Sequence, residues 1–295
     1  MSFINEYKKY QVTFEKWLSS MISKDTCPQT SIHKAMEYSL MAGGKRIRPV
    51  LTLAVNDMLK GDGADIMPYA GAIELIHTYS LIHDDLPCMD NDDFRRGKPT
   101  NHKVFGEAMA VLAGDGLLNL AFEIMLMDIV KEKNTCHQKS ETARMIAGAA
   151  GVSGMIGGQV IDIEAENKDI SYDELCDMHR KKTGALIKAS VIAPVTLLNA
   201  DAEILNSLEV YADNIGLAFQ IKDDILDYEG SREVVGKSIG KDEKSKKATF
   251  VSKLGIEMAK ELLKTSVEKA VEAIKTIDEN DFLIKTAVFI AQRDR

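Results

Sequence analysis

Two clusters of aspartates, about 140 residues apart, are the side chains in this sequence best suited to chemistry. The first cluster contains Asp84, Asp85, Asp90, Asp92 and Asp93 and is followed at once by Arg95, Arg96 and Lys98. The second lies in FQIKDDILDYEG (219–230) and contains Asp223, Asp224 and Asp227. Carboxylates this dense repel one another, so a folded chain keeps them only in solvent or beside cations. One such run is usually a solvated surface, whereas two, each at the polar end of an apolar helix, indicate a shared cation site.

The second cluster is the more informative of the two. Asp223 and Asp227 are four residues apart and share one face of a helix, which costs an isolated helix only roughly a few tenths of a kcal/mol. Spacing alone is therefore also compatible with a solvated acidic helix end. The preceding residues, IGLAFQI, are apolar almost all round, which predicts a helix inside a bundle, where an uncompensated carboxylate is costly. Oxygen ligands without His or Cys favour Mg²⁺, which commonly links one or two carboxylates to substrate phosphates.

Basic residues elsewhere could hold the anionic part of such a ligand. The stretch GGKRIRP (43–49) joins a glycine turn to Lys45 and Arg48 just before a predicted helix. Helix N-terminal amides with flanking Lys and Arg make a phosphate cradle, although the spacing of a Walker A loop is absent. His77 lies two helical turns before Asp84 and faces the same way, but a satisfied core histidine is equally compatible with the pattern. Four further polar residues carry little signal on their own: Lys182, Thr183, Gln220 and Lys237.

The elements that position these residues are predicted to be helical almost throughout. Prolines number only six, and Ala, Leu, Met, Glu and Lys recur at helical spacing. The predicted helices cover 4–22, 30–41, 49–61 (with Pro49 at the first position), 65–86, 105–132, 138–151, 171–199 and 203–228, with more helix over 248–295. The Gly- and charge-rich stretch 230–247 is predicted to be a mobile loop. We therefore expect an all-α, single-domain bundle over residues 1–295, with about ten or more helices around a central cavity.

Composition excludes several classes of protein. The 295 residues, 45% hydrophobic and 28% charged, are typical of a globular protein with a large core. A net charge of −8 argues against a nucleic-acid partner. The four cysteines form no CxxC pair, so neither a disulfide framework nor a zinc site is indicated. The N-terminus lacks the apolar core of a signal peptide, and we see no uninterrupted run of about 18 apolar residues, so we expect a cytoplasmic protein that is not a membrane protein.

Together these motifs resemble the trans-isoprenyl diphosphate synthases, and among them the bacterial farnesyl diphosphate synthases. The resemblance covers nearly the whole chain and is carried by GGKRIRP (43–49), DDLPCMDNDDFRRGKPTNH (84–102), GGQVIDIEAE (157–166), KKTGALI (181–187), FQIKDDILD (219–227) and GKSIGKD (236–242). It implies the isoprenoid synthase fold, a homodimer, and head-to-tail condensation of isopentenyl diphosphate with dimethylallyl and geranyl diphosphate.

The resemblance also implies a role for each candidate residue. Three Mg²⁺ ions would be held on an allylic diphosphate by Asp84, Asp85, Asp90 and Asp223. The same diphosphate would be contacted by Arg95, Lys182, Thr183, Gln220 and Lys237. Isopentenyl diphosphate would be held by Lys45, Arg48, His77 and Arg96. The residues expected to be catalytic are Asp84, Asp85, Arg95, Lys182, Asp223 and Lys237.

Chain length is the finest of these expectations. In the family that this sequence resembles, the product chain length depends on the side chains just before the first aspartate pair, which here are Tyr79 and Ser80. A bulky Tyr79 at the floor of the pocket, together with the inserted pair Pro87-Cys88, predicts a C15 product, (2E,6E)-farnesyl diphosphate. The alternatives are that Tyr79 merely packs in the core, that the product is geranyl or geranylgeranyl diphosphate, and that the chain is a non-catalytic regulatory subunit. Such subunits typically lose one or both aspartate motifs, and both are intact here.

Overall fold

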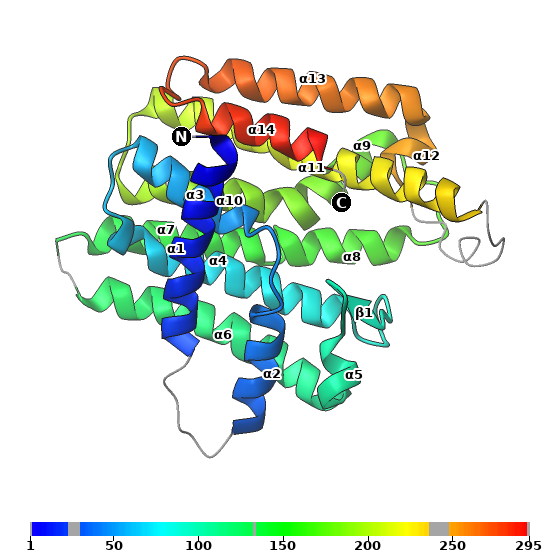
Figure 1. The fold of residues 1–295 in the computed structure, drawn as a ribbon, viewed down its shortest axis with the longest axis horizontal. Helices are drawn as coiled ribbons and strands as arrows, with labels where there is room; N and C mark the ends of the chain where they lie inside the picture. Colours follow the sequence, from blue (N-terminus) through cyan, green and yellow to red (C-terminus); the bar gives the residue numbers. More distant parts are fainter. Residues whose placement is uncertain (1, 23–29, 132–133, 236–247, 294–295) are drawn as a thin grey trace. The chain divides into compact units, whose positions relative to one another are not determined.

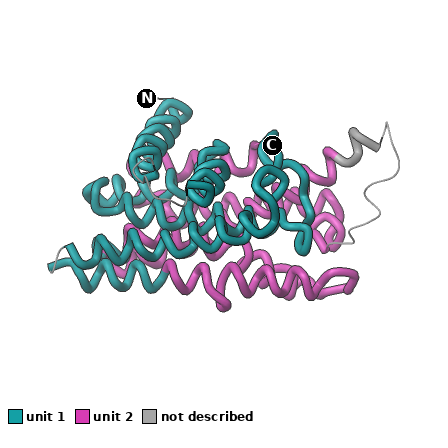
Figure 2. The backbone as a smooth tube through the Cα atoms, turned by 90° about the horizontal axis from the view of Figure 1, so that it is seen from below, with its two compact units in different colours: residues 1–145, 196–199 teal, residues 146–195, 200–295 magenta. Residues whose placement is uncertain are grey.

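A computed structural model of the chain describes residues 2–22, 30–131, 134–235 and 248–293. Over these residues the structure is almost entirely helical, which confirms the predicted all-α class (Figure 1). Two compact units divide the chain, one formed by Met1–Met145 with Thr196–Asn199 and the other by Ile146–Val195 with Ala200–Arg295 (Figure 2). We call them unit 1 and unit 2. The single domain with a central cavity stays a prediction.

Unit 1 is built around one buried helix. Its elements are α1 (Phe3–Ile22), α2 (Thr30–Leu40), α3 (Ile47–Met58), α4 (Gly63–Asp84), β1 (Phe94–Arg95), β2 (Lys98–Pro99), α5 (Asn101–Phe105) and α6 (Glu107–Lys131). The apolar residues of α4 lie on all sides of the helix, so it is covered by α3 and α6 and is also touched by α1 and α2. Asp62 caps its first turn by accepting a hydrogen bond from the Ala64 amide at 2.8 Å. Its polar C-terminal end carries the first aspartate pair.

Three details of unit 1 differ from the sequence prediction. Helix α3 begins at Ile47, so Pro49 occupies the third position of the first turn, where an amide donor is still not needed. The predicted helix 105–132 is interrupted at Gly106, whose φ of +86° ends α5 and lets α6 start in a new direction. The short β-hairpin was not predicted at all, because two-residue strands leave no alternating pattern to recognise.

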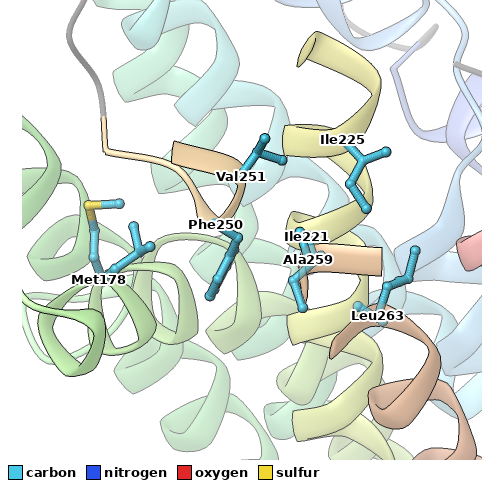
Figure 3. Packing of buried hydrophobic residues seen from close by; sticks show 9 residues of the cluster. Met178, Ile221, Ile225, Phe250, Val251, Ala259 and Leu263 are labelled. Atoms are coloured by element: carbon cyan, nitrogen blue, oxygen red, sulfur yellow. The ribbon is translucent and has the colours of Figure 1, made fainter. Parts of the chain in front are cut away.

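Unit 2 is built around α11 (Ala202–Val235). Its other elements are α8 (Met155–Ala165), α9 (Tyr172–His179), a π-helical turn (Arg180–Gly184), α12 (Phe250–Leu254), α13 (Ile256–Ile274) and α14 (Phe282–Gln292), while α7 (Cys136–Ala150) and α10 (Ala185–Leu197) each run across a boundary between the units in sequence. Ile221 and Ile225 of α11 pack with Phe250 of α12 and Leu263 of α13 in the core of this unit (Figure 3). This core fixes the part of α11 that carries the second aspartate cluster.

Unit 2 corrects three sequence predictions and confirms a fourth. The predicted helix 171–199 is broken by the π-helical turn between α9 and α10. Helix α11 continues to Val235, so residues 230–235 are helical and not loop, and 236–247 lie outside the described residues. The further helix predicted over 248–295 is confirmed by α12, α13 and α14, and Gly255, whose φ is +78°, separates the first two. Helix α8 was missed, since paired glycines weaken a helical pattern.

Two helical stretches are long and apolar enough to cross a membrane by length and composition alone, contrary to our reading of the sequence. They are Glu107–Lys131 and Cys136–Ala165. Core helices of globular proteins pass the same test, and α6 packs along α4 with Ala113, Leu117 and Ala121 in the interior. Length and composition therefore do not place either stretch in a membrane.

The packing of α4 predicts the result of a single methyl addition. Gly71 lies against the ring of Trp17, the only tryptophan in the sequence, so a β-carbon there would overlap that ring. We expect Gly71→Ala to shift the Trp17 fluorescence emission and to lower the free energy of unfolding by roughly 1–3 kcal/mol, the usual cost of overpacking. Gly148→Ala on α7 is the matched control, because nothing lies within 4 Å of the added carbon. Equal stability of the two variants would contradict this packing.

Candidate active site

The first aspartate motif is folded into a turn at the end of α4. The Asp90 amide donates to the Asp84 carbonyl at 2.9 Å, and the Asn91 amide donates to the Leu86 carbonyl at 3.1 Å. Asn91 adopts a φ of 53°, a conformation that Asn tolerates better than most residues. The turn therefore returns the backbone of Asp90 to the end of α4 and brings together two of the predicted metal ligands, Asp84 and Asp90.

Asp85, the third predicted ligand in this motif, is bound by an arginine from the hairpin. Arg95 donates from Nε at 2.7 Å and from Nη2 at 2.6 Å to the same oxygen, Oδ1 of Asp85. The Asp85 side chain is buried, and burial raises its pKa while Arg95 acts in the opposite direction. Arg96 and Gly97, with φ values of 53° and 75°, form the two-residue turn of the hairpin, which fixes Arg95 beside Asp85.

The predicted isopentenyl diphosphate site also lies within unit 1. Lys45 and Arg48 flank Arg46, which is 3% exposed and donates to Glu74 Oε1 at 2.6 Å. His77, on α4, has a pKa well below its ordinary value because it is desolvated and because Arg48, Arg96, Arg95 and Arg46 act on it electrostatically. The cations and the histidine are thus gathered in one region, and His77 is neutral near pH 7.

The two predicted chain-length residues differ in their surroundings. Tyr79 is buried, its ring meets the His83 ring edge-on at 5.7 Å between centroids, and its hydroxyl has no hydrogen-bond partner among the described residues. Burial, with a smaller effect of Asp84, raises the pKa of Tyr79 to about 12. The Ser80 hydroxyl donates to the His77 carbonyl at 2.9 Å, a bond within its own helix. Of these two residues, Tyr79 therefore has the larger side chain, about one helical turn before the aspartates.

In unit 2, Asp223 is paired with an arginine near the C-terminus. Arg293 Nη2 lies 2.7 Å from Asp223 Oδ1 and also donates to the Phe219 carbonyl at 2.6 Å. The guanidinium carbon sits 3.7 Å from the centre of the Phe219 ring. Arg293 is therefore held by α11 at Phe219 and compensates the charge of the proposed metal ligand one turn later.

Asp224 is buried and makes structural hydrogen bonds. It accepts from the Phe250 amide at 2.7 Å and from Gln220 Nε2 at 3.0 Å. Burial raises the pKa of Asp224 to about 6, against the opposing effect of these two donors. Asp224 thus ties the start of α12 to α11 and takes a different role from its neighbour Asp223.

The π-helical turn presents Lys182 and Thr183. Lys182 Nζ contacts Asp162 Oδ2 of α8 at 2.5 Å, and the Thr183 hydroxyl donates to Gln220 Oε1 at 3.0 Å. A β-carbon on Gly158 of α8 would clash with the backbone of Lys182, so only glycine permits this approach. Three predicted diphosphate contacts, Lys182, Thr183 and Gln220, are therefore near one another, whereas Lys237 lies outside the described residues.

Comparison with known proteins places these motifs in a family. Residues 29–285 match the Polyprenyl synthetase family. The chain belongs to this family. It is 45% identical over 294 residues to the farnesyl diphosphate synthase of Bacillus subtilis (strain 168), covering 99% of this chain and 98% of that protein. A crystal structure of an FPP/GFPP synthase from Zymomonas mobilis superposes with a TM-score of 0.87 at 35% identity, covering 98% of this chain and 100% of that one.

Membership establishes the general activity of this polyprenyl synthetase. The chain is a trans-prenyl diphosphate synthase, a prenyltransferase of isoprenoid biosynthesis that takes prenyl diphosphate substrates. Identity does not decide the product, because a geranylgeranyl diphosphate synthase of Cyanophora paradoxa is 46% identical over 268 residues, covering 90% of this chain and 88% of that protein. Product length must be argued from the pocket.

The donor atoms fit the Mg²⁺ that the family generally uses. Among the described residues, no three His, Cys, Asp or Glu side chains converge closely enough to hold a metal ion without other ligands. Magnesium rarely uses such all-protein cages, since it keeps waters and bridges one or two carboxylates to substrate phosphates. The oxygen atoms of the aspartate side chains are of the donor type that Mg²⁺ prefers.

Three charged residues of these sites were not singled out from the sequence, Arg46, Asp162 and Arg293, and Asp224 was placed in its cluster without its structural role. Arg293 and Asp223 are separated by 70 positions, and Lys182 and Asp162 by 20. No local pattern links such pairs. Arg46 is next to Lys45 in the sequence, and Asp224 is next to Asp223. The hydrogen bonds of Arg46 and Asp224 hold the backbone that carries these neighbours.

The histidine before the π-helical turn predicts a pH dependence of stability. His179 is 8% exposed, its two ring nitrogens have no hydrogen-bond partner among the described residues, and burial lowers its pKa to about 4. In the unfolded chain it protonates near pH 6.5. The free energy of unfolding should therefore fall as pH drops from about 6.5 to about 4, by roughly 3 kcal/mol from this group.

His179→Phe should remove that contribution while keeping an aromatic ring beside Phe250. The measurement is denaturant unfolding in EDTA between pH 4.5 and 7, taken as the difference between wild type and variant. Because Asp224, with its raised pKa, opposes His179 in the same range, only this difference isolates the histidine. His137→Gln, at an exposed position of α7, serves as the control. A difference that does not change with pH would show that His179 has the same pKa in the folded and the unfolded chain, and would contradict the effect of burial.

Proposed function

We propose that this polyprenyl synthetase makes (2E,6E)-farnesyl diphosphate by 1′–4 condensation of isopentenyl diphosphate with dimethylallyl and then geranyl diphosphate. The observation that carries the proposal is the arrangement at the end of α4. Asp84, Asp85 and Asp90 are held there by a hydrogen-bonded turn and by Arg95, and buried Tyr79 lies one helical turn earlier. A diphosphate bound at the aspartates would place its prenyl chain along the helix toward that tyrosine.

The residues with proposed binding roles come from both units. Three Mg²⁺ ions on the allylic diphosphate would be held by Asp84, Asp85, Asp90 and Asp223. The same diphosphate is contacted by Arg95, Lys182, Thr183, Gln220 and Lys237. Isopentenyl diphosphate is held by Lys45, Arg48, His77 and Arg96. This assignment requires the aspartates of unit 1 and unit 2 to share one diphosphate.

The residues act on the charges that the reaction creates. Magnesium, when bound, neutralises charge on the leaving diphosphate. Arg95 and Lys182 stabilise the electron pair that leaves with diphosphate when the allylic C–O bond breaks. The isopentenyl double bond then attacks the allylic cation, which forms the new C–C bond and leaves a second cation. This cation loses a proton to diphosphate and becomes the elongated product. Neutral His77 contributes a hydrogen bond and no charge, which leaves Lys45, Arg48 and Arg96 to compensate the isopentenyl diphosphate.

Incubation with Mg²⁺, isopentenyl diphosphate and either dimethylallyl or geranyl diphosphate tests the proposal. After dephosphorylation, chromatography should show farnesol as the main product from both allylic substrates. Asp84→Asn and Asp223→Asn should each reduce the rate by at least about 100-fold, as expected for loss of a group that binds the leaving charge. Geraniol or geranylgeraniol as the main product would favour the shorter or longer synthase. No elongated product with any pair would favour the regulatory subunit.

The floor assigned to Tyr79 makes a separate prediction. Tyr79→Ala should lengthen the product to C20 or beyond, because it removes the largest side chain one turn before the aspartates. Tyr79→Phe, which keeps the ring and loses only the hydroxyl, should still give C15. Unchanged C15 from the alanine variant would assign Tyr79 to core packing and leave the floor to another residue.

We also propose that the enzyme is a cytoplasmic homodimer. Support for the dimer comes from α6, which exposes large apolar residues near both of its ends: Val111 and Leu112 near its start, and Leu126, Met127 and Val130 near its end. A second copy of the chain could cover them. Light scattering should give twice the 32.6 kDa of one chain. Leu126→Arg together with Val130→Glu should give the monomer mass, and a wild-type monomer would contradict the dimer.

A further inference from the structure

The loop between α2 and α3 carries Lys45, which we have assigned to isopentenyl diphosphate. Three consecutive carbonyl oxygens of this loop each accept a hydrogen bond from a different side chain. Arg96 Nη1 donates to Gly43, Gln11 Nε2 donates to Gly44 at 3.0 Å, and the Tyr7 hydroxyl donates to Lys45 at 2.8 Å. A loop whose successive carbonyls are all bonded by side chains has a fixed orientation of its peptide planes.

The conformation of this loop needs such support. Gly43, Gly44 and Arg46 have φ values of 83°, 124° and 52°, all in the region that L side chains rarely adopt. A β-carbon on Gly44 would lie 2.7 Å from Cζ of Arg96, so the Arg96 guanidinium rests directly on the glycine. For Arg46 the left-handed conformation is unfavourable, and the surrounding contacts must offset its cost.

Arg46 anchors the other end of the loop. Its guanidinium donates from Nη1 to Glu74 Oε1 of α4 at 2.6 Å and from Nη2 to the Leu40 carbonyl of α2 at 2.5 Å. Both side chains of the Arg46–Glu74 pair are almost completely buried, so the pair is shielded from competing water. Lys45 is therefore fixed between an anchor on α4 and a hydrogen bond from α1.

Helix α1 contributes two of these contacts from one face. Tyr7 and Gln11 are four residues apart, one helical turn, and so lie side by side. The part of the chain that matches the Polyprenyl synthetase family begins at residue 29, after α1 ends at Ile22. The holding of the loop by α1 therefore lies outside the matched family region.

We propose that Tyr7 and Gln11 are positioning residues for isopentenyl diphosphate. They donate hydrogen bonds to the carbonyl oxygens of Lys45 and Gly44, so these partial negative charges are compensated. The same bonds fix the direction in which the Lys45 side chain projects from the backbone. The isopentenyl diphosphate is bound by Lys45 and Arg48, and α1 sets how well they are aligned. This inference rests on the proposed function of Lys45 and Arg48.

Steady-state kinetics of two tyrosine variants tests the inference. Tyr7→Phe removes the hydrogen bond to Lys45 and keeps the ring. It should raise KM for isopentenyl diphosphate about 2- to 10-fold, the effect of one hydrogen bond, with kcat and the allylic KM unchanged. Tyr10→Phe is the matched control on the same helix, because the Tyr10 hydroxyl donates to Asp57 Oδ2 of α3 at 3.0 Å. It should leave both KM values as in wild type.

Three results would overturn the inference: an unchanged KM for isopentenyl diphosphate in Tyr7→Phe, a joint rise of both KM values, or an equal effect of Tyr10→Phe. If Tyr7→Phe does not fold, Gln11→Met decides on the same criteria, since it loses only the bond to Gly44. Lys45→Gln separates the two levels of the argument. A normal isopentenyl KM in Lys45→Gln refutes the proposed substrate site, whereas a raised KM there with a normal KM in Tyr7→Phe refutes only the role of α1.

Discussion

The structure depends on how it neutralises densely packed carboxylates. In each aspartate cluster one residue is paired with an arginine that a different element fixes in place: Asp85 with Arg95 of the hairpin, and Asp223 with Arg293 after α14. Asp224 instead takes backbone and amide donors. These partners allow the like charges to remain together without metal, because each buried charge meets a donor. In our proposal Asp85 and Asp223, together with Asp84 and Asp90, bind a metal–diphosphate complex from these positions.

Two largely apolar helices, α4 and α11, position the two aspartate clusters. Helix α4 is buried on all sides and ends at Asp84, and α11 is packed by α12 and α13 where Asp223 and Asp224 project. Close backbone approaches then refine the positions, as at Gly158 beside Lys182 and at Gly44 beside Arg96. Some residues that bind substrate in our proposal are thus held by residues with no proposed substrate contact, as Lys182 is by Asp162. Burial and the nearby arginines lower the pKa of His77, so it supplies no positive charge of its own near pH 7.

The all-α class and most helices were predictable, because α1 and α2 are amphipathic and α4 is one long apolar stretch. The sequence did not predict where helices break. A single glycine ended α5, and the π-helical turn after His179 joins α9 to α10 with no loop between them. The aspartate and basic motifs were visible as residue types, but their partners were not. Arg46 folds back on Glu74, and Arg293 reaches α11 across 70 positions, so only tertiary structure reveals them.

The central claim is that both aspartate clusters bind one diphosphate through magnesium. A crystal structure of the enzyme with Mg²⁺ and inorganic diphosphate tests it most directly. The account predicts magnesium ions about 2.0–2.1 Å from oxygens of both Asp84 and Asp223, with all of them bound to the same diphosphate. A diphosphate held by one cluster alone, with the other cluster still paired only to its arginine, would contradict it.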